Sequence, residues 1–123
     1  RLITIKPFSA GDIGAIEKAI LSSNLGITPG NDGKIIRLVM PVLTEERRRD
    51  LVKMVHKRVE EAHVSARNIR RDANELLKAA EKDKLISEDD HYQAREEVQR
   101  LLDATIKRSD EIGVAKEAEI MEV

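Results

Sequence analysis

Apolar or small side chains recur between Thr44 and Ala80 at steps that alternate between three and four residues, and no Gly or Pro interrupts them. The set comprises Val52, Val55, Val59, Ala62, Ala66, Ile69, Ala73, Leu76 and Ala80. A seven-residue repeat of this kind predicts one continuous helix that packs along nearly parallel or antiparallel neighbours. Thr44 suits the N-cap position because its hydroxyl accepts a hydrogen bond from a backbone N–H of the first turn.

A second long helix is predicted to begin after Ser87 and to run to about residue 122. Ser87 is followed three residues later by Asp90, which resembles a capping box. Gly113 weakens the middle of this helix by about 1 kcal/mol relative to Ala. A short connection makes helices 44–80 and 87–122 antiparallel neighbours. Two helices leave half of each apolar stripe uncovered, so a third helix is expected, and this sequence does not contain it.

The first 43 residues follow a different pattern. LITIKPF and KIIRLVMP predict two short strands, each closed by a proline, and DIGAIEKAILSS between them predicts a helix capped by Asp12 or Ser9. The stretch NLGITPGNDG is dense in turn residues and predicts a loop. We therefore expect an α+β chain with an incomplete α/β lobe over residues 1–43 and a helical bundle domain over 44–123. The start at Arg1, inside a strand, suggests a fragment that lacks upstream strands.

Composition narrows the function classes. The chain is 37% charged, contains no cysteine and has no apolar run near the roughly 20 residues that span a bilayer. These features exclude a disulfide framework, a Cys nucleophile and a thiolate metal site. Residues 45–80 carry ten Lys or Arg against seven Asp or Glu, whereas residues 88–123 carry five against eleven. The first long helix could therefore meet nucleic acid, which the second would repel.

The main candidate binding cluster is ARNIRRDA, which holds Arg67, Arg70 and Arg71. Arg67 lies one helical turn from both other arginines, so the three guanidinium groups share one patch. Arg49, His56, His63 and Arg70 also recur every seven residues, on the same side of the helix. This surface is either a solvated helix face with local salt bridges or a phosphate-binding strip, since guanidinium groups match phosphate oxygens bidentately. Without interleaved aromatic residues, structured RNA fits better than single strands.

No constellation of catalytic or metal-ligating residues is visible. His56 and His63 are seven residues apart, and no third His or carboxylate completes a metal site with them. The glycine-rich GITPGNDG lacks the Lys-Ser/Thr of a phosphate-binding loop. The sequence therefore predicts neither an enzyme nor a cofactor or metal site.

Several blocks resemble one known family. LTEERRRDLVKMV, VSARNIRRDANELLK, KLISEDD and the C-terminal KEAEIMEV, in this order and spacing, are similar to the bacterial ribosome recycling factors. AIEKAILSSNLGITPGNDGKIIRLVMPVLTEERR extends the resemblance through the first 43 residues, so it covers essentially the whole chain. The portion that precedes this region in the family, including the first helix of the bundle, is absent.

The resemblance implies a three-helix bundle joined to an α/β lobe by a hinge at Pro41, Val42, Leu43 and Thr44. It also implies binding to the large ribosomal subunit and its 23S-type rRNA through Arg67, Arg70 and Arg71, to which the periodic stripe adds Arg49 and His63. With elongation factor G and GTP, such a protein splits the post-termination ribosome without covalent chemistry. The expected protein is a monomer when complete, located in the bacterial cytoplasm or in an organelle of bacterial descent, with no membrane partner.

A different class of function remains open from the residues alone. The stripe from Val52 to Ala80 is rich in Ala, which suits close approach of helices. A plain coiled-coil interaction module that dimerises through this stripe is the alternative, and its helicity would rise with protein concentration.

Overall fold

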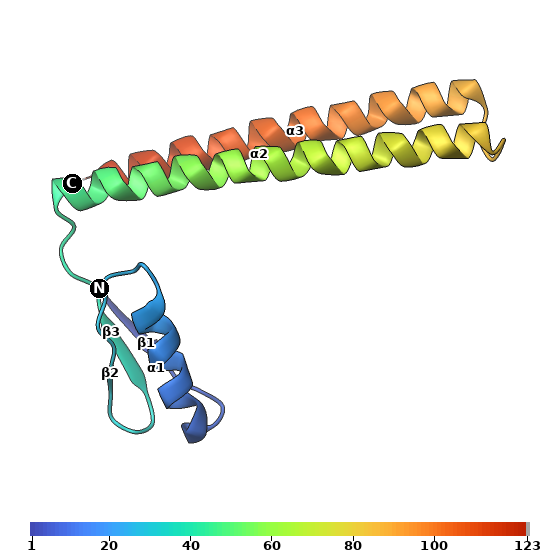
Figure 1. The fold of residues 1–123 in the computed structure, drawn as a ribbon. Coiled ribbons are helices and arrows are strands. Elements are labelled where there is room, and N and C mark those ends of the chain that lie inside the picture. Colours follow the sequence, from blue (N-terminus) through green and yellow to red (C-terminus); the bar gives the residue numbers. More distant parts are fainter. Residues whose placement is uncertain (123) are drawn as a thin grey trace. The chain divides into compact units, whose positions relative to one another are not determined.

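The computed structural model describes residues 1–122, and these form an α+β chain, as the sequence predicts (Figure 1). Contacts divide the chain into two compact units, Arg1–Leu43 and the residues from Thr44 onward. The first unit holds a small sheet and one α-helix, and the second consists of two long helices. No helix within residues 1–122 is both long and apolar enough to cross a membrane.

The sheet of the first unit has three antiparallel strands in the order β1-β3-β2. β1 spans Leu2–Ile5, β2 spans Gly30–Asn31 and β3 spans Ile36–Val39. β2 lies in the stretch that the sequence predicts as loop only, because its two residues are typical turn formers. It is nevertheless a strand, since Gly30 pairs with Arg37 and Asn31 with Ile36.

One helix, α1 (Ile13–Ser22), follows β1 after a short 3-10 turn at Ala10–Asp12. The hydroxyl of Ser9 accepts a hydrogen bond from the N–H of Gly11 at 3.3 Å, whereas Asp12 makes no side-chain cap. Ser9 is therefore the residue that caps this segment. The core of the unit is aliphatic: Ile13, Ile36 and Leu38 are buried, and Ile5, Ile16, Ile20, Ile27 and Met40 pack against them.

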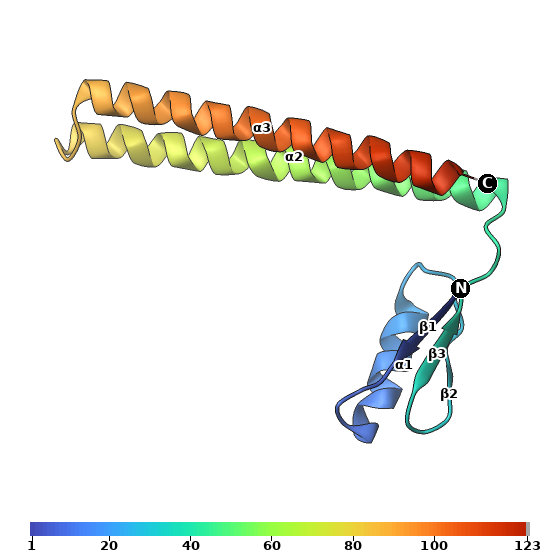
Figure 2. The same ribbon diagram turned by 180° about the vertical axis from the view of Figure 1, so that it is seen from behind.

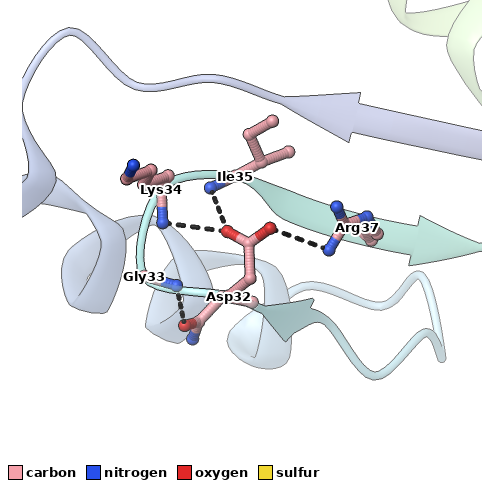
Figure 3. Close-up of polar contacts among 6 residues, drawn as sticks. Asp32, Gly33, Lys34, Ile35 and Arg37 are labelled. Atoms are coloured by element: carbon pink, nitrogen blue, oxygen red, sulfur yellow. Dashed lines mark hydrogen bonds and ion pairs between the residues drawn. The ribbon is translucent and has the colours of Figure 1, made fainter.

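The turn between β2 and β3 is organised by the carboxylate of Asp32 (Figure 3). Asp32 Oδ1 accepts hydrogen bonds from the backbone N–H of Ile35 at 2.9 Å and of Lys34 at 3.0 Å, and Oδ2 lies 3.0 Å from Nη1 of Arg37. Gly33 occupies the left-handed region with a φ of +88°. The two backbone N–H groups, and then the Arg37 guanidinium, hold the pKa of Asp32 below its ordinary value of 3.8.

The second unit is a hairpin of two antiparallel helices, α2 (Glu45–Lys82) and α3 (Glu88–Met121), which run side by side in both views (Figures 1 and 2). The Thr44 hydroxyl accepts a hydrogen bond from the Arg47 N–H at 3.1 Å, which confirms the expected N-cap of α2. Ser87 and Asp90 form the reciprocal capping box expected at the start of α3. Both long helices therefore begin where the cap signals in the sequence place them.

The turn between the long helices is a Schellman motif. The N–H of Leu85 bonds to the carbonyl of Ala80, and the N–H of Lys84 bonds to the carbonyl of Glu81, both at 2.9 Å. Lys84 has a φ of +58°, a left-handed conformation that glycine usually supplies at this position. This turn directs α3 back along α2 and fixes which residues of the two helices meet.

The face of α2 that meets α3 includes only part of the predicted apolar stripe. Val52, Val55, Val59, Ala66, Ala73 and Ala80 are half-buried, together with Leu51, His63, Arg70 and Leu77. Ile69 and Leu76 are instead 69% and 72% exposed. Because α3 covers only one edge of the stripe, the other edge remains uncovered, and the third helix of the expected bundle has no counterpart within residues 1–122.

The uncovered edge forms an apolar groove with α3. About 250 Å³ of space lies between Ala66, Ile69 and Ala73 of α2 and Val98, Leu101, Leu102 and Thr105 of α3. Among the described residues of α3, Leu102 and Gly113 are buried. Gly113 is a point of close approach, because a Cβ added there would lie 2.8 Å from Cγ2 of Val59.

Candidate nucleic-acid interface

Arg67, Arg70 and Arg71 lie on α2 at the rim of a polar groove between the two long helices. The groove has a volume of about 850 Å³. Its other charged or polar lining residues are Asn68, Asn74, Glu75 and Lys78 from α2 and His91, Tyr92, Arg95, Glu96 and Gln99 from α3. The three arginines, which the helical spacing places on one patch of α2, thus share the groove with side chains of α3.

The groove is positively charged, although α3 is acidic overall. Four arginines and Lys78 stand against two carboxylates, Glu75 and Glu96. The third carboxylate nearby, Glu81, contacts the His91 ring at Nδ1. Within residues 1–122 neither Lys78 nor Arg95 forms an ion pair. Cations that carry little local compensation are the groups that attract phosphate.

The three predicted arginines differ in the partners of their guanidinium groups. Arg67 Nη1 lies 3.7 Å from a Glu60 carboxylate oxygen, and Arg71 Nε lies 3.9 Å from Asp72. These distances are long for ion pairs, and all four side chains are well exposed, so each pair contributes little to stability. Arg70 is half-buried and its Nη1 donates to Oε1 of Gln99 at 3.2 Å. Arg70 is thus the one of the three that reaches across to α3.

Arg49 and His63, the other two predicted contact residues, do not line this groove. Arg49 is exposed and binds Glu45 one turn earlier. The His63 side chain is only 13% exposed, and its Nε2 lies 2.8 Å from Oδ1 of Asp110 without the alignment of a hydrogen bond. The seven-residue spacing therefore brings His63 and Arg70 to the α3 side of α2, but only Arg70 opens into the groove.

The predicted hinge residues Pro41, Val42 and Leu43 belong to no helix or strand. They connect the last sheet contact, from the Met40 N–H to the Arg1 carbonyl at 2.7 Å, to the cap residue Thr44. Val42 is 70% exposed. Within residues 1–122 no group of three or more His, Cys, Asp or Glu side chains is placed to hold a metal ion.

Comparison with known proteins assigns the fold and sequence to one family. The family model described as "Ribosome recycling factor" matches residues 1–121. The chain belongs to the ribosome recycling factor family. The ribosome-recycling factor of Syntrophomonas wolfei is 58% identical over 123 residues, and that of Carboxydothermus hydrogenoformans is 57% identical over the same length. Both matches cover 100% of this chain but 66% of the relative, so the chain spans slightly less than two thirds of their length.

Solved structures of ribosome recycling factors share the fold. A solution structure of a ribosome recycling factor matches with a TM-score of 0.63 and 43% identity, covering 99% of this chain and 64% of the other. A second match is the T. thermophilus ribosome recycling factor, in a structure where it and the E. coli elongation factor G are bound to the E. coli post-termination complex. It has a TM-score of 0.56 and 40% identity over 99% of this chain and 66% of the other.

The sequence pattern does not assign the other groove residues to the site, among them Lys78, Tyr92, Arg95 and Gln99. Tyr92 is the only tyrosine of the chain and is exposed in the groove, although α2 itself has no Phe, Tyr or Trp. The position of the turn could have predicted them. When a short turn joins two antiparallel helices, the residue numbers of facing residues add up to a nearly constant value. The pairs Arg70–Gln99 and Glu81–His91 follow that rule.

Proposed function

We propose that this chain acts in ribosome recycling after termination, as a component that binds the large ribosomal subunit through the groove of Arg67, Arg70 and Arg71. The observation that carries the proposal is the gathering of four arginines and Lys78 in one polar groove of an otherwise acidic hairpin. Membership of the ribosome recycling factor family supports the same assignment. The partners proposed from the family are 23S-type rRNA and elongation factor G, and the proposed location is the cytoplasm.

The groove suits the backbone of structured RNA. Guanidinium groups on one helix at spacings of three and four residues lie about one turn apart, close to the spacing of successive phosphates. Tyr92 adds one aromatic face, which alone does not make a platform for a run of single-stranded bases. The proposed role is binding, because five of the seven Arg, Lys, Asp and Glu side chains that line the groove are cations suited to phosphate.

Pro41–Thr44 is proposed as the hinge between the two units. Pro41, Val42 and Leu43 belong to no helix or strand, and Thr44 is the residue that caps α2. Such a segment can change its dihedral angles without breaking a packed core. In this proposal elongation factor G supplies the energy, and this chain only transmits the resulting force.

The test is co-sedimentation of the protein with purified large ribosomal subunits over a series of salt concentrations. Arg70→Ala is expected to weaken binding and to lower the slope of log affinity against log salt by about 0.7 to 0.9, the value of one lost phosphate contact. Arg108→Ala is the matched control, because Arg108 is an exposed α3 arginine outside the groove that pairs with Glu111 at 3.8 Å. Equal effects of the two substitutions, or salt-independent binding, would refute the proposal.

The second candidate function is a coiled-coil module that dimerises through its apolar face. The exposed Ile69, Leu76, Leu101 and Ile112 favour it, because a face of this kind is usually covered by another helix. Sedimentation equilibrium separates the two functions. A dimer that forms with rising concentration and leaves large subunits in the supernatant would favour the module.

A further inference from the structure

A ladder of polar contacts joins α2 to α3 at intervals of seven residues. His56 Nε2 lies 3.0 Å from Oε2 of Glu117, and His63 Nε2 lies 2.8 Å from Oδ1 of Asp110. Seven residues separate the two histidines on α2, and seven separate the two carboxylates on α3. The next members of both series are Arg70 and Asp103. The repeat therefore places a carboxylate opposite Arg70.

Arg70 does not pair with that carboxylate, because Gln99 lies between them. Oε1 of Gln99 accepts a hydrogen bond from Nη1 of Arg70 at 3.2 Å, and Nε2 of Gln99 donates to Oδ1 of Asp103 at 2.9 Å. Gln99 is half-buried, as is Arg70. The third step of the ladder is thus a relay through an amide instead of a direct ion pair.

The two ends of the relay fix the orientation of the amide. A flipped Gln99 would turn its NH₂ group toward the guanidinium, which has only donors, and its oxygen toward the carboxylate, which has only acceptors. Both hydrogen bonds would be lost and replaced by repulsive contacts. Asp103 therefore holds the oxygen of Gln99 toward Arg70.

The relay also leaves the charge of Arg70 unpaired. Within residues 1–122 no carboxylate lies at ion-pair distance from Arg70, whereas Arg67, Arg71, Arg58, Arg100 and Arg108 each have one. A phosphate must displace or share such a carboxylate. A neutral amide oxygen orients the guanidinium through one N–H and leaves its remaining donors and its full charge available.

We propose that Gln99 is a positioning residue that presents Arg70 to a phosphate group of the RNA in the groove without neutralising its charge. The inference rests on the proposed function, because it assumes that the groove binds RNA. It adds α3 to a binding site that the sequence assigns to α2 alone. Its physical basis is preorganisation: a guanidinium already held in place loses less side-chain entropy when it binds.

Two substitutions separate orientation from charge. Gln99→Leu removes the acceptor but leaves Arg70 cationic. Large-subunit affinity is then expected to fall about threefold to tenfold with an unchanged salt slope, since one hydrogen bond is lost and no phosphate contact is. Gln99→Glu places a carboxylate against Arg70, so both affinity and salt slope are expected to fall nearly as far as in Arg70→Ala. Asp103→Asn, added to Gln99→Glu, relieves the repulsion between the new acid and Asp103.

The decisive comparison is made in the Arg70→Ala background. If Gln99 acts through Arg70, Gln99→Leu changes affinity by less than about 1.5-fold there, since nothing remains to be positioned. An equal loss in both backgrounds would refute the positioning role, and wild-type affinity of Gln99→Glu would refute the argument from charge. Circular dichroism on every variant is expected to show unchanged helix content, because Gln99 lines the polar groove and not the apolar one between the helices.

A measurement without ribosomes distinguishes failure of the positioning role of Gln99 from failure of the proposed function. Nitrogen-15 relaxation of arginine Nε groups reports the order of each guanidinium in the free protein. Gln99→Leu is expected to lower the order of Arg70 and to leave that of Arg67 unchanged. If wild-type protein does not bind large subunits, the proposed function fails, and this relaxation result still decides whether Gln99 positions Arg70. Unchanged order of Arg70 would overturn the inference.

Discussion

Gly113 offers a quantitative test of how closely α2 and α3 pack. A Cβ added at Gly113 would lie 2.8 Å from Cγ2 of Val59, closer than real Cβ contacts allow. Val59 cannot easily move aside, because a β-branched side chain in a helix has one strongly preferred χ1 rotamer. Gly113→Ala therefore combines a gain in helix propensity with a steric clash against a stiff neighbour.

The two effects have opposite signs and similar sizes. Replacing Gly by Ala inside a helix stabilises it by about 1 kcal/mol, whereas overpacking a contact costs about 1–3 kcal/mol. We expect Gly113→Ala to lower the free energy of unfolding by about 1 kcal/mol. In a Val59→Ala background the clash disappears, so the same change should raise the free energy of unfolding by about 1 kcal/mol. The sign of the effect thus depends on Val59.

Urea unfolding followed by circular dichroism at 222 nm measures all four proteins of this double-mutant cycle. The coupling between the two positions is expected to be about 2 kcal/mol. Ala115→Gly, at an exposed position of the same helix, calibrates the propensity effect without a packing change. If Gly113→Ala stabilised the protein equally in both backgrounds, the helices would not approach as closely as described, and the reasoning would be refuted.

Two further predictions concern the turns. Lys84→Gly is expected to raise the free energy of unfolding by about 1 kcal/mol in the same urea assay, because Lys84 has a φ of +58° and glycine adopts this conformation without a Cβ penalty. For Asp32, the folded-state pKa is lowered, so its stabilising effect is complete above the ordinary value near 3.8 and is lost as pH falls through the lowered value. NMR-monitored urea unfolding of residues 1–43 should therefore show a midpoint that decreases with acidification, and Asp32→Asn should flatten this dependence.

Periodicity predicted the long helices but not which edge of the stripe α3 would cover. The spacing of Val52, Val55 and Val59 is compatible with a neighbouring helix on either edge of the stripe. The Schellman turn at Lys84 decides between them, and it brings Leu77 rather than Leu76 toward α3. A turn geometry that depends on a lysine in the left-handed region leaves no signal in a hydrophobic pattern.

Two other departures from the sequence prediction have local causes. Gly30–Asn31 pairs with β3 although both residues favour turns, because the hydrogen bonds of an edge strand can override weak propensities. Helix propensity predicts Gly113 only as a weak point of the helix. Its buried position against Val59 shows that it also permits close helix packing, which propensity alone does not reveal.

The sequence predicts the part of the candidate site on α2 but not the part on α3. The spacing within α2 is enough to place Arg67, Arg70 and Arg71 on one patch, since neighbours three and four residues apart share a helix face. The contributions of Tyr92, Arg95 and Gln99 depend on the register of α3, which no pattern within α2 encodes.

Arg48 gives the hairpin a mechanical property. Its Nη1 donates to the carbonyls of Ile120, at 2.5 Å, and of Glu122, so the first turn of α2 is bonded to the last turn of α3. The chain enters the hairpin at Thr44, one turn before Arg48. We therefore expect a force transmitted through Leu43 to act on both helices together, because the Arg48 hydrogen bonds oppose separation of the start of α2 from the end of α3.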